Sequence, residues 1–371
     1  MKTGKAGSRP RVVLVKPPER SAFNFGAYSL GTLAAVVDGR ADVSILDATA
    51  LPLRIAAERA FAARASIIGV TVMSSESVAA VSRFLRRLRA SGAASRTRPL
   101  ILCGGHGAAC RPGPLIDAGA GAVVIGEGET TFRAIVDDGF RPGMAGTMCR
   151  RRGKLVAGTP QKLIAPLDAL PLLRRDLMPA PADGVHLMET SRGCPHACAF
   201  CETTRFYGRR WRAKTPARAA FEARRLVEDF GARIIHFVDD NFAANPRRVV
   251  RLCAELEKGP LPVFFMVSAR ADDLMAGYEV IPSIASARIL RVNVGVETLD
   301  AASSRRAGKP LAFDLYRETF HRLTEARIFS VASFIVGLPG ESPGERDRAV
   351  EKAVEAEPAA ARRAAVAGEA Q

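Results

Sequence analysis

Short apolar runs alternate with amphipathic stretches through the first 140 residues. Five runs rich in aliphatic residues predict strands, at residues 11–17, 42–48, 66–72, 99–105 and 121–129. Between them, apolar residues recur at helical spacing, which predicts helices at residues 29–38, 54–65, 75–91 and 130–138. Because the apolar runs are continuous, we expect strands buried on both faces of a parallel sheet. Five strand–helix units predict a doubly wound, flavodoxin-like (Rossmann-type) α/β domain.

Three of these strands are followed by segments rich in glycine and small polar residues. The segments are TVMSSES (71–77), CGGHGAA (103–109) and GEGET (126–130). In doubly wound sheets a ligand binds beyond the carboxyl ends of the strands, and glycine there allows the backbone to approach it closely. Turns between strands and helices also need glycine and serine, but three such segments at one edge favour a site for a large ligand.

The second half of the chain repeats the same alternation. Strands are expected at residues 185–191, 233–240, 263–270, 289–297 and 329–341, with helices such as 217–231 and 246–259 between them. Repeated units of this kind predict a partial (β/α) barrel of the TIM type. The expected organisation is therefore a first domain at 1–140, a proline-containing linker at 141–183, a second domain at 184–345, and a helical or disordered tail at 346–371.

Composition and charge narrow the class of protein. The 371 residues are 48% hydrophobic and 25% charged, as in globular domains. No apolar run approaches the roughly 20 residues of a membrane span, and no signal peptide is recognisable, so a cytoplasmic location is expected. The net charge of +16 comes from scattered arginines, and only 6% of residues are aromatic. A nucleic-acid partner is therefore not expected, whereas an anionic cofactor or substrate is compatible with the charge.

The stretch TSRGCPHACAFCE (190–202) gathers three of the seven cysteines directly after the first strand of the second domain. In the reducing cytoplasm, clustered cysteines indicate metal or redox chemistry rather than disulfides. Three thiolates at C-x3-C-x2-C spacing, from Cys194, Cys198 and Cys201, can hold three corners of an iron–sulfur cubane and leave one iron open. A structural zinc site would need a fourth ligand. His196 is the nearest candidate, but it lies between two cysteines in a loop with little slack.

This stretch resembles the radical S-adenosylmethionine (SAM) superfamily, and the likeness extends from Val185 to about Ser342. The resemblance implies a 4Fe–4S cluster whose open iron binds SAM and whose reduction yields a 5′-deoxyadenosyl radical. It rests on the cysteine spacing, on the phenylalanine before the last cysteine, and on the strand-end segments FVDDNF, VSAR, GVE and GLPG. The residues that the resemblance places near SAM are Phe200, Asp239, Asp240, Ser268, Arg270, Glu297 and Gly337.

The first domain resembles the cobalamin-binding domain that precedes the radical SAM domain in one large subgroup. The likeness rests on VVLVKPP, DVSILDA, GGHGAACRPG and GEGET. The residues that it places near cobalamin are Thr71, Ser74, Ser75, Gly104, Gly105, His106, Gly126, Glu127 and Gly128. The Asp-x-His-x-x-Gly motif that supplies a histidine to cobalt is absent. The resemblance therefore implies that His106 lines the pocket or packs against the nucleotide tail.

In this subgroup most members methylate an unactivated carbon or a phosphinate phosphorus. One SAM methylates the reduced cobalamin, a second supplies the radical that removes a substrate hydrogen, and the substrate radical takes the methyl group. The resemblance implies a small-molecule or peptide substrate and an electron donor such as flavodoxin or ferredoxin. Some relatives keep cobalamin but catalyse cyclisation or rearrangement, and this alternative stays open.

Two further alternatives follow from the rest of the chain. Relatives usually continue through a sixth strand and a C-terminal segment, whereas here the alanine-rich stretch after GLPGES ends the chain. We therefore expect an unusually open barrel, or a shortened chain that serves as a cofactor-binding partner protein. A tRNA methylthiotransferase would need a second cysteine set, and Cys103, Cys110 and Cys149 do not recreate a cluster loop.

Overall fold

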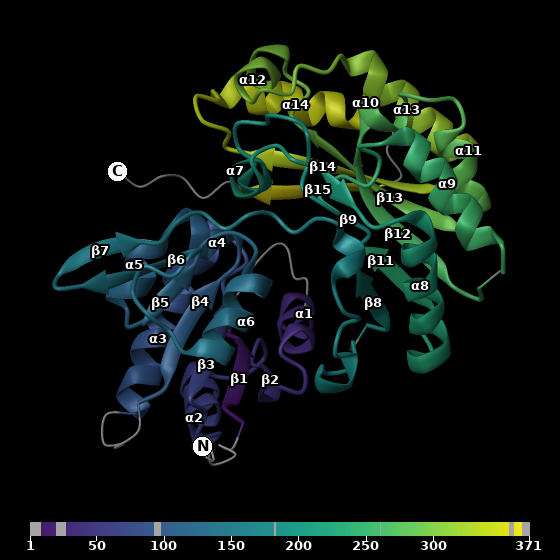
Figure 1. The fold of residues 1–371 in the computed structure, drawn as a ribbon. Helices are drawn as coiled ribbons and strands as arrows, with labels where there is room; N and C mark the ends of the chain where they lie inside the picture. Colours follow the sequence, from purple (N-terminus) through teal and green to yellow (C-terminus); the bar gives the residue numbers. More distant parts are fainter. Residues whose placement is uncertain are drawn as a thin grey trace. The chain divides into compact units, whose positions relative to one another are not determined.

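The computed structural model describes residues 9–19, 27–92, 98–181, 183–259, 261–355 and 360–365. The chain divides into two compact units (Figure 1). The N-terminal unit comprises Met1–Ile164 and Ala169–Ala180, and the C-terminal unit comprises Ala165–Asp168 and Pro181–Gln371. Among the described residues, no helix has both the length and the apolar character that a membrane crossing requires.

The N-terminal unit contains one sheet with the strand order β2-β1-β3-β4-β5-β6-β7. The first five strands are parallel and follow the predicted runs: β1 (Arg11–Lys16), β2 (Asp42–Asp47), β3 (Ile67–Thr71), β4 (Leu100–Gly104) and β5 (Ala122–Val124). Their order is that of the flavodoxin-like fold, which confirms the predicted fold class.

Helices cover both faces of this sheet. They are α1 (Tyr28–Val36), α2 (Leu53–Ala62), α3 (Val78–Ser91) with the preceding 3-10 turn η1 (Ser75–Ser77), α4 (His106–Cys110), α5 (Pro112–Asp117) and α6 (Gly128–Asp138). One apolar core lies on the side of α2, α3 and α5, and a second lies on the side of α1 and α6. Strand residues alternate between the two cores, with Val13 and Val15 in the first and Val12 and Leu14 in the second. Burial on both faces explains the unbroken apolar runs in the sequence.

The segment interpreted as a linker, residues 141–183, contains regular structure. β6 (Thr147–Arg151) pairs antiparallel with β5, and β7 (Lys154–Ala157) pairs antiparallel with β6. The turn uses Arg152 (φ 49°) and Gly153 (φ 78°), the two positive values of a tight hairpin turn. The 3-10 turns η2 (Leu167–Ala169) and η3 (Arg175–Leu177) follow. The hairpin escaped prediction because its strands are short and its outer positions are basic, which leaves no apolar run.

The C-terminal unit contains a parallel sheet of six strands in the order β15-β14-β13-β12-β11-β8. The strands are β8 (Val185–Met188), β11 (Ile234–Phe237), β12 (Phe264–Arg270), β13 (Ile289–Glu297), β14 (Phe329–Val336) and β15 (Ala360–Ala365). A separate antiparallel pair joins β9 (Ser191–Arg192) to β10 (Arg212–Ala213). The order follows the chain, as in a partial (β/α) barrel.

Helices of the C-terminal unit connect these strands, and several of them share one apolar core with the sheet. The longer helices are α8 (Pro216–Phe230), α9 (Pro246–Glu257), α11 (Val280–Ser286), α13 (Phe313–Glu325) and α14 (Pro343–Glu355), and the short ones are α7 (Glu202–Tyr207), α10 (Ala271–Leu274) and α12 (Ala301–Arg306). The sequence predicts the start of α9 correctly, because the Asn245 side chain accepts a hydrogen bond from the Arg248 N–H and Pro246 occupies the first turn.

Strand alternation in this unit separates the core from the candidate site. In β12 the residues Phe265, Val267 and Ala269 are buried in the core, and the half-buried Ser268 and Arg270 point to the opposite face. β13 shows the same alternation of core and half-buried positions. The sheet therefore presents its polar side chains on the face away from the helices.

The range 346–371, expected to be a helical or disordered tail, contains part of a helix and a strand among its described residues. Within the range 346–371, α14 continues to Glu355, and Ala360–Ala365 form β15, which pairs in parallel with β14. A sixth strand is therefore present in the sheet. The alanine-rich sequence of β15 favours a helix locally, and pairing with the exposed edge of β14 overrides that preference.

Candidate cluster and cofactor sites

The three motif cysteines lie in one loop between β9 and α7. Cys194, Cys198 and Cys201 are half-buried, and none forms a disulfide. Cys201 caps the start of α7, and its N–H donates to the Cys198 carbonyl at 3.2 Å. The Cys201 thiol is close enough to affect the pKa of both other thiols. The loop thus gathers three thiols, which fits a cluster with three cysteine ligands.

Polar groups surround two of these thiols. Burial raises the pKa of Cys194 to about 11, against the opposing hydrogen bonds from the His196 N–H and the Asn241 amide. Burial also raises the pKa of Cys198, and the positive charges of Arg270 and Lys309 oppose it. Arg270 donates to the Cys198 sulfur at 3.2 Å. Burial therefore favours the protonated form of these two thiols, and binding iron would supply the charge that stabilises thiolates.

Arg270, predicted to contact SAM, is fixed by its neighbour. Its guanidinium donates two hydrogen bonds to Asp272, at 3.0 and 2.8 Å, while its third nitrogen faces Cys198. The pairing lowers the pKa of Asp272 against the effect of burial, which acts in the opposite direction and is the largest contribution. The guanidinium therefore holds a fixed positive charge beside a cluster cysteine.

The loop is braced at its beginning by Gly193 and Asp240. Gly193 has φ +82°, and a Cβ there would lie 2.1 Å from the Arg210 carbonyl, so glycine is required. Its N–H donates to Asp240 at 2.7 Å, and the Thr203 hydroxyl donates to the same carboxylate at 2.8 Å. The exposed Asp240 thus joins the two sides of the loop. Its contact with SAM stays a prediction.

Asp239 braces the segment that precedes the cysteine loop. Its carboxylate is buried and accepts four hydrogen bonds, from the N–H and hydroxyl groups of Thr190 and Ser191, at 2.5–3.0 Å. These donors engage both oxygens of Asp239. The contact of Asp239 with SAM stays a prediction. The carboxylate fixes the segment that leads into the cysteine loop.

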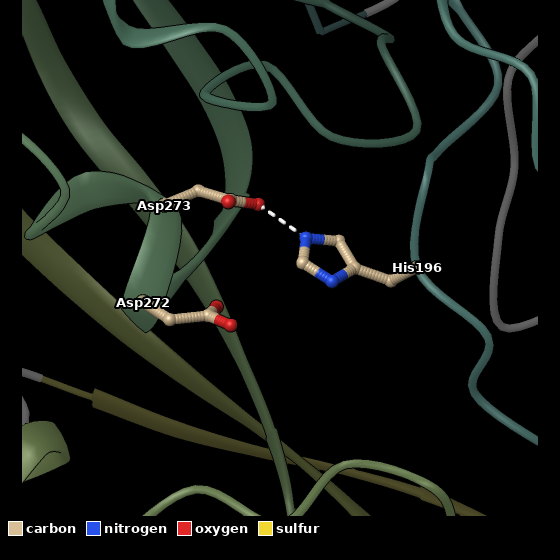
Figure 2. Close-up of side chains that lie close together, drawn as sticks. All are labelled: His196, Asp272 and Asp273. Atoms are coloured by element: carbon tan, nitrogen blue, oxygen red, sulfur yellow. Dashed lines mark hydrogen bonds and ion pairs between the residues drawn. The ribbon is translucent and has the colours of Figure 1, made fainter.

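His196 turns toward α10 instead of completing a zinc site (Figure 2). Its Nε2 lies 2.8 Å from Asp273 Oδ2, and the Asn241 amide donates to the same oxygen at 2.6 Å. His196, Asp272 and Asp273 lie close enough to hold a cation, but each is already paired with a protein group. The histidine therefore ties the cysteine loop to α10 and leaves three thiols as the ligand set.

Glu297, another predicted SAM contact, lies at an irregularity in β13. Its φ is +68°, a left-handed value that is uncommon for a residue with a side chain, and the pairing with β14 shifts register there. The buried Lys309 donates to Glu297 at 3.1 Å and to the Gly295 carbonyl at 2.8 Å. A Cβ on Gly295 would lie 2.6 Å from the Glu297 carboxylate and 2.9 Å from the Lys309 nitrogen. A side chain at position 295 would therefore displace the two charged groups from this arrangement.

Sequence reasoning missed Lys309. It stands in the unremarkable segment AGKP, and nothing local indicates a partner 12 residues earlier. The segment also supports the cysteine loop, because the Ala307 carbonyl accepts from the Ala199 N–H at 3.0 Å and Gly308 packs against Cys198. The combination of Gly295, Glu297 and a downstream lysine is the signal that could have identified it.

The other residues predicted near SAM are less constrained. Ser268 lies on the same face of β12 as Arg270, and Phe200 is half-buried inside the cysteine loop. Gly337 follows β14 with φ +88°, a Cβ there would meet no atom within 4 Å, and its N–H donates to Glu341 at 2.8 Å. All three lie in the C-terminal unit, and their contacts with SAM stay predictions.

The residues predicted near cobalamin gather at one edge of the N-terminal sheet. Thr71 ends β3 and Gly104 ends β4, and the two are register partners. Gly126 follows β5 with φ +88°, and a Cβ there would meet no atom within 4 Å, so the backbone is open. The remaining residues of the set lie after these strands, in the turns or at the first positions of the helices that follow: Ser74, Ser75, Gly105, His106, Glu127 and Gly128. The edge offers the open backbone that a large planar ligand needs.

Several residues of this set have structural roles in the turns. A Cβ on Gly105 would lie 2.5 Å from the Val72 carbonyl, so α4 can approach β3 only with glycine at that position. Ser74 and Ser77 hydroxyls lie 3.2 Å apart, and Glu127 is buried and accepts from the Ile164 N–H. His106 begins α4 beside this edge. Part of the motif therefore builds the turns, and direct contact with cobalamin stays a prediction.

Two family models match the chain. The Radical SAM superfamily model matches residues 188–353, and the B12 binding domain model matches residues 23–136. The first match contains the cysteine loop and the Glu297–Lys309 pair, and the second contains the glycine-rich edge of the N-terminal sheet. The two domain types and their order agree with the resemblance noted from the sequence.

Two curated relatives are named as uncharacterized methyltransferases. An uncharacterized methyltransferase of Pyrococcus horikoshii is 26% identical over 360 residues, which cover 90% of this chain and 76% of that protein. An uncharacterized methyltransferase of Synechocystis is 30% identical over 256 residues, which cover 68% of this chain and 46% of that protein. The chain thus spans about three quarters of one relative and less than half of the other.

A solved structure has the same fold. The radical SAM methyltransferase TsrM of Kitasatospora setae, with tryptophan substrate and a SAM analogue bound, superposes with a TM-score of 0.77 at 18% identity. The match covers 96% of this chain and 73% of TsrM. Another structure of TsrM contains cobalamin and a [4Fe-4S] cluster, and it superposes with a TM-score of 0.75. This chain is a radical SAM protein with an N-terminal B12-binding domain.

Proposed function

We propose that this protein is a cobalamin-dependent radical SAM enzyme that methylates an unactivated carbon of a biosynthetic intermediate. The observation that carries the proposal is the set of three free thiols in one loop, with His196 engaged elsewhere and Arg270 fixed beside Cys198. The methyltransferase relatives favour methyl transfer over cyclisation or rearrangement.

The residues of the C-terminal unit would hold the cluster and SAM. Cys194, Cys198 and Cys201 would ligate three irons of a 4Fe–4S cluster. When bound, the cluster supplies an electron that cleaves SAM, and cobalamin supplies a transferable methyl group. The guanidinium of Arg270 and the ammonium of Lys309 stabilise the negative charge of the Cys198 thiolate. Asp240 and Asp273 keep the loop in place through Gly193 and His196.

The residues of the N-terminal edge would hold cobalamin through backbone contacts and small polar groups. Gly104 and Gly126 leave space for cobalamin to approach the backbone closely. Thr71 ends β3, which lies between the two apolar cores. A low-potential one-electron donor such as flavodoxin or ferredoxin would reduce the cluster. The net charge of +16 suits an acidic partner of this kind.

The test is product analysis on anaerobically reconstituted protein, with dithionite as reductant and SAM as the only added substrate. A radical SAM methyltransferase should form 5′-deoxyadenosine, and it should form S-adenosylhomocysteine only when cobalamin is bound. A cyclase or rearrangement enzyme would form 5′-deoxyadenosine alone. A protein that binds the cofactors and forms neither product would be a cofactor-binding partner, contrary to the proposal.

A matched pair of cysteine variants tests the cluster. Cys198→Ala should lower bound iron and sulfide to background and abolish 5′-deoxyadenosine, while cobalamin binding persists. Cys253→Ala removes a buried cysteine of α9 outside the cysteine loop, so it should keep the iron content of the wild type. Iron and sulfide assays with the absorption spectrum provide the measurement. Full iron content in Cys198→Ala would contradict the assigned ligand set.

A further inference from the structure

A buried pair of opposite charges lies where β1 ends. Lys16 is the last residue of β1, is 2% exposed, and is the register partner of Asp47 at the end of β2. Glu19 follows after two prolines and is 7% exposed. Burial lowers the pKa of Lys16, and the charges of Asp47 and Glu19 only partly oppose this. Two carboxylates therefore lie close enough to one buried lysine to interact with its charge.

The two carboxylates differ in their hydrogen bonds. Asp47 accepts from the Thr49 N–H at 3.0 Å and from the Thr49 hydroxyl at 2.6 Å. Neither oxygen of Glu19 has a hydrogen-bond partner in the described part of the chain. Burial raises the pKa of Glu19, and the nearby Ser77 hydroxyl and Lys16 only partly oppose this. Because a buried carboxylate without donors destabilises the fold, its retention points to a donor beyond the described residues.

The location of Glu19 indicates which ligand could supply that donor. β1 lies between β2 and β3, so the chain turns to opposite sides after β1 and after β2. Such a switch point is where doubly wound sheets bind their ligands. Ser77, whose hydroxyl lowers the pKa of Glu19 against the effect of burial, belongs to the turn after β3. Glu19 therefore lies at the same edge as the glycine-rich turns, while the match to the B12-binding model begins only at residue 23.

We propose that Glu19 is a cobalamin-binding residue whose carboxylate accepts hydrogen bonds from the primary amide side chains of the corrin ring. The inference rests on the proposed function and extends it to a residue outside the recognised motifs. The corrin carries several amide N–H donors and presents them around its rim. Such donors satisfy a buried acceptor without adding a second positive charge beside Lys16.

The experiment compares Glu19→Gln with Asp47→Asn in the full chain. Hydroxocobalamin binding is measured by spectrophotometric titration, and stability without cobalamin is measured by urea unfolding. Glu19→Gln should weaken cobalamin binding about tenfold or more, since hydrogen bonds to charged groups are the stronger class. Its stability should not fall, because the substitution removes a buried charge that lacks donors while Asp47 still neutralises Lys16. Asp47→Asn should lower stability, because it weakens the contact with Thr49 and Lys16, and should keep the affinity.

The outcomes separate this inference from the proposed function. Wild-type binding together with unchanged affinity in Glu19→Gln would overturn the role of Glu19 alone. A loss of stability in Glu19→Gln that matches its loss of affinity would assign Glu19 to the fold and also overturn the inference. Absence of cobalamin binding by the wild-type chain would overturn both. Glu19→Ala is measured in parallel, so that the affinity comparison survives if one variant folds poorly.

Discussion

Individual side chains at the candidate site differ in how far the sequence reveals them. The cysteine spacing identifies Cys194, Cys198 and Cys201 directly, because a three-thiol loop has a local pattern. The role of Asp239 could not be predicted, because its four donors come from Thr190 and Ser191, 49 and 48 positions earlier. Local patterns predict ligands that share a loop, whereas hydrogen-bond saturation depends on which segments the fold brings together.

The Glu297–Lys309 pair leads to a prediction about stability. Lys309→Met should lower the free energy of unfolding by roughly 3–5 kcal/mol, because it leaves the Glu297 carboxylate buried without its cation. Urea unfolding of the cofactor-free protein measures the change. Lys258→Met removes an exposed lysine paired with Glu255 and should change stability by less than about 1 kcal/mol. Equal effects of the two substitutions would show that Glu297 does not depend on its lysine.

The elements follow the sequence most closely where apolar periodicity is strong. The strands β1–β5, β8 and β11–β14 lie within or close to the predicted apolar runs, because burial on one or both faces requires such runs. The short helices α4 and α5, the β6–β7 hairpin and β15 were not predicted. Each of these is short, basic or rich in alanine and glycine. Their conformation depends on pairing or packing with a neighbour that the local sequence does not describe.

The pairing of β15 with β14 predicts a consequence of truncation. A chain ending at residue 355 should aggregate, because the apolar strand FSVASFIV then exposes a free hydrogen-bonding edge. A chain ending at residue 365 keeps β15 and should remain monodisperse. Size-exclusion chromatography with light scattering distinguishes the two. Equal behaviour of both chains would mean that β15 does not protect the edge.

The whole chain contains separate apolar cores in its two units. The cores of the N-terminal unit contain residues from β1–β5 and their helices, and the core of the C-terminal unit contains residues from β8 and β11–β14. Each unit therefore has the interior that independent folding requires. The two cofactors of the proposed function would also bind to different units.

Calorimetry tests this division. Thermal unfolding should show two transitions. Hydroxocobalamin should raise the midpoint temperature only of the transition that belongs to the N-terminal unit. At about 100 times the dissociation constant the stabilisation should be about 2.7 kcal/mol, because the ligand binds only the folded state. The N-terminal unit expressed alone identifies its transition. A single transition that cobalamin shifts as a whole would show that the units unfold together.

The β6–β7 hairpin offers a place to attach a tag or label. Its turn at Arg152 and Gly153 is exposed and belongs neither to the glycine-rich edge nor to the cysteine loop. A compact tag or spectroscopic label can be attached there without touching the residues assigned to either cofactor. The hairpin thus provides a handle for immobilising the enzyme under anaerobic conditions while its substrate is sought in cell extracts.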